Sequence, residues 1–183
     1  MGTSGNMSTS NQYVKYTISI SQNSQNISGN YSNATVSVRF FRTNSGYTTY
    51  GSGTCYCKIH GTTYSATVSP SQKITDSGIN LFSKTLDIYH NNDGTKTLTC
   101  SAWISMDTPL SSSEQSYSQT LSTIPRASKP TLSSSSVTMG NSVTISTNRA
   151  SSSFTHWLYY QIGSGGWNTI GMGIGTSKSW TVP

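Results

Sequence analysis

The sequence YHNNDGTKTLTCSAWISM, residues 89–106, contains a turn signal followed directly by a run of alternating residues. Asn92-Asp93-Gly94 is typical of a tight turn, because Gly adopts a positive φ without steric cost and Asn and Asp bond their own backbone. The apolar residues after the turn share one parity: Leu98, Cys100, Ala102, Ile104 and Met106. The other parity holds Thr97, Thr99, Ser101 and Trp103. A period of two predicts a β-strand with one buried face.

The same period recurs along the first two thirds of the chain. The alternating segments are residues 13–21, 33–43, 54–60, 63–69, 79–90, 96–106 and 114–124. About seven short strands separated by turn signals are typical of an immunoglobulin-like β-sandwich. No window shows the 3.6-residue apolar stripe of a helix. We therefore expect an all-β protein with a flexible N-terminal segment over residues 1–12 and an immunoglobulin-like sandwich over residues 13–124.

A second unit is predicted after a proline-containing segment, IPRASKP, residues 124–130. Proline cannot donate to a strand ladder and stiffens a short connection, so residues 125–130 are interpreted as a linker. Alternation resumes over residues 131–183, with a hairpin expected across Gly163-Ser164-Gly165-Gly166. About five strands in so short a stretch are fewer than the first sandwich has. We expect a second, incomplete immunoglobulin-like unit and a sequence that belongs to a longer protein.

Charge and hydropathy argue against nucleic-acid and membrane partners. The net charge is +6, but the basic residues are spread singly from Lys15 to Lys178 rather than clustered on one predicted face. After residue 128 the chain has Lys129, Arg149 and Lys178 and no acidic residue. The longest apolar runs are much shorter than a membrane span, and the N-terminus has no basic and apolar segments of a signal peptide. We therefore expect no nucleic acid, no membrane and no signal peptide.

No catalytic, cofactor or metal site is expected. The cysteines are odd in number, and Cys55-Tyr56-Cys57 lacks metal-type spacing, so free thiols are expected. A Cys–His nucleophile needs an exposed thiolate beside His60, His90 or His156, whereas Cys100 is predicted to face the core. The carboxylates show no close pairing of the kind a glycosidase requires. We interpret the chain as a protein without enzymatic activity.

Aromatic residues are the candidates for binding. Tyr47 and Tyr50 lie in a Gly/Ser-rich connection, and alternation in HWLYY separates Trp157 and Tyr159 from His156, Leu158 and Tyr160. Trp167 lies on the returning strand. Exposed Tyr and Trp stack on sugar rings while Asn and Ser supply hydrogen bonds. The glycan-binding candidates are Tyr47, Tyr50, Trp157, Tyr159 and Trp167. One face of HWLYY must be core, and the sequence does not decide which.

Several segments resemble the minor tail proteins of siphoviruses that infect Gram-positive cocci of the streptococcal and lactococcal type, a family of unknown function. The resemblance rests on YHNNDGTKTLTCSAW, IPRAS, TLSSSSVTMGNSVTISTNRASSSFTHWLYY and GIGTSKSWTVP, and covers the chain from about residue 13. It implies a structural protein of the tail tip or baseplate, made in the bacterial cytoplasm, with other phage tail proteins as partners and homo-oligomers in the virion. It also implies contact with host cell-wall polysaccharide, and it supplies no catalytic residues.

Two other functions remain open at this point. Exposed aromatics on a β-sandwich also suit a carbohydrate-binding module of a secreted bacterial glycanase, although such a module needs a secretory route. The same fold also serves capsid decoration proteins. The exposed edges of a sandwich are natural docking sites for neighbouring copies, which favours self-association in any virion role.

Overall fold

The computed structural model describes residues 1–46, 51–107, 110–126, 130–147, 156–174 and 177–183. All regular elements in these ranges are β-strands, which confirms the predicted all-β class. Within the same ranges no helix is long and apolar enough to cross a membrane. The chain divides into two compact units, the first comprising Met1–Asn26, Asn30–Asn91 and Thr95–Thr123, and the second Ile27–Gly29, Asn92–Gly94 and Ile124–Pro183.

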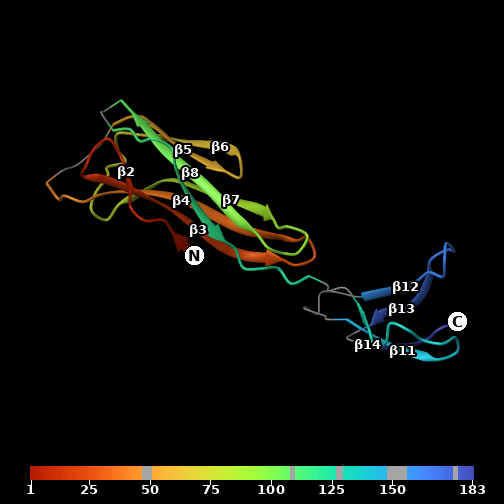
Figure 1. Ribbon diagram of the computed structural model, residues 1–183. Helices are drawn as coiled ribbons and strands as arrows, with labels where there is room; N and C mark the ends of the chain where they lie inside the picture. The colour runs from red at the N-terminus through yellow and green to blue at the C-terminus, as the bar shows by residue number, and fades with distance from the viewer. Residues whose placement is uncertain (47–50, 108–109, 127–129, 148–155, 175–176) are drawn as a thin grey trace. The chain divides into compact units, whose positions relative to one another are not determined.

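The strands described in the first unit form two antiparallel sheets (Figure 1). The strands of the five-stranded sheet are β1 (Gly2–Thr3), β2 (Met7–Ser8), β3 (Val14–Asn26), β4 (Tyr31–Arg42) and β7 (Ile79–Tyr89). Those of the four-stranded sheet are β5 (Gly53–Ile59), β6 (Thr62–Val68), β8 (Thr97–Met106) and β9 (Gln115–Thr120). The sheet orders are β1-β3-β4-β7, with β2 also on β3, and β6-β5-β8-β9. Lettered A, B, C, C′, E, F and G, strands β3 to β9 give sheets A-B-E and C′-C-F-G, compatible with an immunoglobulin-like arrangement.

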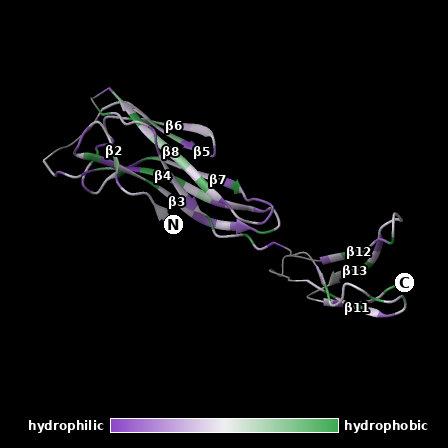
Figure 2. Ribbon diagram, viewed as in Figure 1, coloured by the Kyte–Doolittle hydropathy of each residue, from purple (hydrophilic) through white to green (hydrophobic). Residues whose placement is uncertain are grey.

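The hydrophobic core of this unit lies between the two sheets and draws on alternate residues of both. Figure 2 shows hydrophobic and hydrophilic residues interleaved along these strands, as expected for strands buried on one face. Tyr16 and Phe40, both fully buried, stack with ring centroids 4.9 Å apart. The Tyr16 hydroxyl donates to the Ala102 carbonyl oxygen at 2.9 Å, which ties the five-stranded sheet to β8. A buried phenol therefore has its polar end satisfied.

Two turns have the backbone conformation that their glycines predict. The β5–β6 hairpin turns at His60 (φ 49°) and Gly61 (φ 86°), as in the type I′ turns preferred by two-residue hairpins. Gly94, in the Asn92-Asp93-Gly94 turn, has a φ of 82° and is buried. A Cβ on Gly94 would lie 1.9 Å from the Ile124 carbonyl oxygen, while one on Gly61 would meet nothing within 4 Å. Gly94 is therefore fixed by packing as well as by conformation.

The N-terminal segment differs from the expectation of flexibility over residues 1–12. Strand β1 pairs Gly2 with Ile20, and β2 pairs Met7 with Tyr16, so both lie on β3. Met7 is buried and belongs to the core. Two strands of two residues each are too short to show alternation, so their pairing depends on the edge that β3 offers them.

The described residues of the second unit also form two sheets. Its strands are β10 (Thr131–Leu132), β11 (Ser142–Ser146), β12 (His156–Tyr160), β13 (Asn168–Ile174) and β14 (Ser177–Thr181). One sheet has the order β10-β11-β14 and the other is the β12-β13 pair. This repeats the arrangement of the strands lettered A, B, C, C′ and E in the first unit. Of the residues predicted as a linker, 127–129 lie outside the described ranges, while the Arg126 guanidinium donates to the Ile27 carbonyl oxygen at 3.1 Å.

Candidate functional site

Strand β12 exposes aromatic side chains on one face. Trp157 is 55% exposed and Tyr159 is 47% exposed, whereas His156 and Leu158, which alternate with them, are buried. Trp167 is 70% exposed and lies two residues before Thr169, the register partner of Tyr159. Trp167 immediately precedes β13, which begins at Asn168, so it lies in the connection and not on the returning strand as predicted. We call Trp157, Tyr159 and Trp167 the aromatic surface of the second unit.

The opposite face of β12 is the core face. Leu158 packs with Ile145, and Ile170 and Trp180 pack against this pair. Tyr160, half-buried, lies against Trp180 with ring centroids 4.9 Å apart. The structure thus decides what the sequence left open: Trp157 and Tyr159 face solvent, and Tyr160 packs inside. Of the other predicted glycan-binding residues, Tyr47 and Tyr50 lie outside the described residues.

His156 is the buried polar residue of this strand. Its Nδ1 lies 3.2 Å from the Thr147 hydroxyl, while its Nε2 is buried without a hydrogen-bond partner among the described residues. A buried imidazole with one nitrogen bonded is held in a fixed orientation but is not presented to a ligand. We therefore interpret His156 as a structural residue on the buried face of β12, opposite the face that exposes Trp157 and Tyr159.

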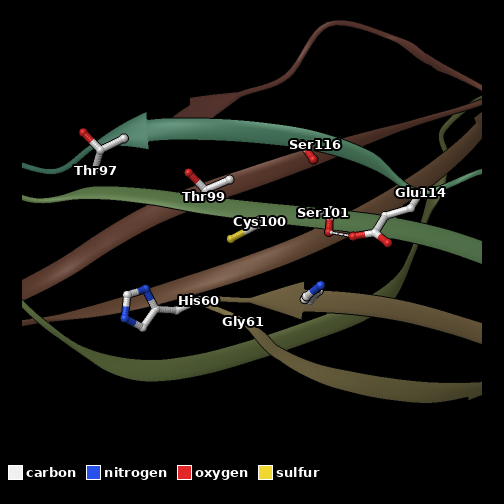
Figure 3. A pocket seen from close by; sticks show the side chains of 9 residues that line it. His60, Gly61, Thr97, Thr99, Cys100, Ser101, Glu114 and Ser116 are labelled. Carbon is white, nitrogen blue, oxygen red and sulfur yellow. Dashed lines mark hydrogen bonds between the residues drawn. The ribbon is translucent and has the colours of Figure 1, made fainter.

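A shallow groove, which we call the sheet groove, lies on the outer face of the four-stranded sheet (Figure 3). Its volume is about 480 Å³. Its lining includes Lys58 of β5, His60 in the turn after β5, Ser101 of β8, and Glu114 just before β9. The Ser101 hydroxyl, itself buried, donates to a Glu114 carboxylate oxygen. Figure 3 shows this contact as a dashed line beneath Ser116. The groove therefore combines an ammonium, a carboxylate and several hydroxyls on one sheet face.

Next to the sheet groove lies an aromatic pair that was not among the predicted site residues. Tyr56 and Trp103 are register partners on β5 and β8, and their rings stack 5.0 Å apart at an angle of 11°. Both are half-buried on the outer face, since their neighbours Cys55 and Cys57 point inward. The sequence signal was the alternation in TCYCKIH, which puts Tyr56 and Lys58 on one side. Only the pairing of β5 with β8 brings Trp103 beside them.

The thiols are free, as predicted, and all are buried. Burial raises the pKa of Cys55 and that of Cys100 to about 12, and it raises the pKa of Cys57 further. The thiolate is the nucleophilic form of cysteine, so these side chains are not activated at neutral pH. Within the described ranges no three His, Cys, Asp or Glu residues gather in a way that could hold a metal ion.

Comparison with known proteins gives one finding. A family model described as "Siphovirus protein of unknown function (DUF859)" matches residues 7–183. No curated protein and no solved structure matches the chain.

Proposed function

The chain belongs to this siphovirus family, and we propose that it is a structural protein of the virion, a minor tail protein of the tail tip or baseplate. Membership over residues 7–183 covers both units and supports a phage role over that of a glycanase module. Units of paired β-sheets present exposed edge strands, here β6 and β9 in the first unit, to which neighbouring proteins can add. The proposed partners are other tail proteins and further copies of this chain, without an enzymatic step.

We place the host-facing contact on the aromatic surface of the second unit. The observation that carries it is the exposure of Trp157, Tyr159 and Trp167, since large aromatic side chains are costly to leave in water without a partner. From residue 129 onward the chain carries basic residues and no acidic ones. That balance suits the anionic polysaccharides of Gram-positive cell walls, to which the aromatic rings would add stacking on sugar rings.

The virion location is tested by immunogold labelling of intact phage particles with antibodies raised against the chain. Gold at the distal end of the tail is the expected result, because a tail-tip protein is accessible there. Gold distributed over the head would instead place the chain among capsid decoration proteins and overturn the tail assignment. Particles treated with pre-immune serum provide the background.

Wall binding is tested by sedimenting the chain with purified cell walls of Gram-positive cocci. We expect Trp167→Ala and Trp157→Ala each to reduce the apparent affinity about tenfold, the effect of losing about 1.4 kcal/mol of stacking and burial. Tyr89→Ala is the matched control, because Tyr89 is 65% exposed but lies on β7 of the first unit. Raising the salt concentration should weaken binding only partly, since screening acts on charges and not on stacking. Equal affinity of all variants would refute the role of the aromatic surface.

A further inference from the structure

Apart from Cys100, the residues that line the sheet groove lie outside the hydrophobic core of the first unit. On β5 the inward Cys57 and Ile59 are buried, while Lys58 between them is exposed. Glu114 is also exposed, and no ion pair joins it to Lys58 among the described residues. The charged groups are thus available to a ligand instead of being used to neutralise each other. Between them Ser101 supplies a buried hydroxyl, which donates a hydrogen bond to the Glu114 carboxylate.

Hydrogen-bonding capacity in the sheet groove is mixed and abundant. A carboxylate has about four acceptor positions, and Ser101 uses one of those on Glu114. The ammonium of Lys58 brings donors only. The hydroxyls of Thr97 and Thr99 bond to those of Thr120 and Ser118 on β9, and each keeps further hydrogen-bonding capacity, because a hydroxyl has one donor and two acceptor positions. Such an alternation of donors and acceptors matches a ligand whose hydroxyl groups also do both. A sugar is a ligand of this kind.

The charge balance distinguishes between classes of saccharide. One lysine, Lys58, and one carboxylate residue, Glu114, line the sheet groove. A polyanion would meet the Glu114 carboxylate, and a polycation would meet the Lys58 ammonium, at a cost from like-charge repulsion in each case. A neutral chain of sugars avoids both costs and can use both groups as hydrogen-bond partners.

An apolar platform continues the groove along the strands. The Lys58–Ser101 register pair is followed two residues along by the Tyr56–Trp103 pair, a distance of about 7 Å at the rise of a β-strand. That spacing is comparable to one sugar residue. The groove volume of about 480 Å³ lies within the range of small-ligand sites. An oligosaccharide can therefore hydrogen-bond to Lys58 and Glu114 while the next sugar contacts the aromatic pair.

We propose that the sheet groove binds a neutral oligosaccharide, with Glu114 and Lys58 as hydrogen-bonding residues and Tyr56 and Trp103 as the stacking platform. This site lies in the first unit and does not depend on the aromatic surface of the second unit.

The test is a titration of the full chain, labelled with ¹⁵N, with neutral tetrasaccharides: tetra-N-acetylchitotetraose, cellotetraose and maltotetraose. A hyaluronan tetrasaccharide serves as the anionic counterpart and a chitosan tetramer as the cationic one. We expect a neutral tetrasaccharide to shift the amide signals of Lys58, Ser101 and Glu114 and the indole signal of Trp103. We expect Glu114→Gln and Lys58→Gln to weaken that binding about tenfold, the effect of losing a hydrogen bond to a charged group.

The controls keep the outcome clear. Asp87→Asn and Lys73→Gln change an exposed charge of each sign elsewhere in the same unit and should leave the affinity unchanged. The spectra of the unliganded variants show whether each remains folded. The proposal is overturned if none of the neutral tetrasaccharides binds, or if a charged one binds more tightly. It is equally overturned if the shifts fall on the second unit or if Glu114→Gln and Lys58→Gln bind like the unaltered chain.

Discussion

Replacing Phe40 with alanine is expected to lower the free energy of unfolding of the sandwich by about 3–5 kcal/mol, the usual cost of removing a large buried aromatic ring. Phe40 is fully buried in β4 and stacks on Tyr16. The loss leaves a cavity beside Tyr16, whose hydroxyl holds the Ala102 carbonyl of the opposite sheet. Urea unfolding followed by circular dichroism measures the change, and a melting temperature lower by more than about 10 °C should accompany it.

The neighbouring Phe41 provides the matched control. It has the same side chain one position along β4 but lies on the outer face, half-buried, with the Arg39 guanidinium 5.6 Å from its ring centroid. Phe41→Ala should cost about 1 kcal/mol, because it loses partial burial and one cation–π contact. Similar losses for the two variants would contradict the assignment of the inner and outer faces of β4.

Gly94→Ala is expected to lower the free energy of unfolding by about 3 kcal/mol or more, combining an unfavourable positive φ with a collision. The Gly94 carbonyl accepts a hydrogen bond from the Ile124 amide at 2.9 Å, so the two backbones are as close as paired strands. An added Cβ at 1.9 Å from the Ile124 carbonyl oxygen cannot be accommodated without moving one of them.

Gly61→Ala isolates the conformational part of this cost. Gly61 has a φ of 86°, close to the 82° of Gly94, but open space surrounds its Cα. The substitution should therefore cost about 1–2 kcal/mol, the penalty of the left-handed region alone. Chemical denaturation of both variants gives the difference, which should be at least about 1 kcal/mol. If Gly61→Ala costs as much as Gly94→Ala, the contact with Ile124 does not contribute.

The strands of the sandwich could be predicted from sequence because half-burial leaves a period of two along each of them. In β8, for example, Leu98 and Cys100 are buried and Thr97 and Thr99 are exposed, as the parity indicated. Strands β1 and β2 could not be predicted, since two residues carry no period. The resemblance to siphovirus proteins is confirmed at the level of the family over residues 7–183.

The candidate sites were less accessible to sequence reasoning. Alternation separated Trp157 and Tyr159 from Tyr160, but the choice of the core face depended on Trp180, which packs on Tyr160 from a strand later in the chain. The sheet groove could not be predicted from the sequence, because Lys58, Ser101 and Glu114 belong to segments that are far apart along the chain or separated by a turn. Only the pairing of β5 with β8, and of β8 with β9, brings them onto one face.

The pairing order of the strands also has a consequence for the rate at which the first unit folds. The β3–β4 and β5–β6 pairs are hairpins, which close short loops and form quickly. By contrast, the β4–β7 and β5–β8 pairs join strands that are far apart in the sequence. Tyr31 of β4 pairs with Tyr89 of β7, and Ile59 of β5 pairs with Cys100 of β8. Contacts so distant along the chain bring a large loop-closure entropy, and folding is slowed to milliseconds or seconds. Until then the open edges of β4 and β5 can pair with other nascent chains, so aggregation competes with folding during synthesis.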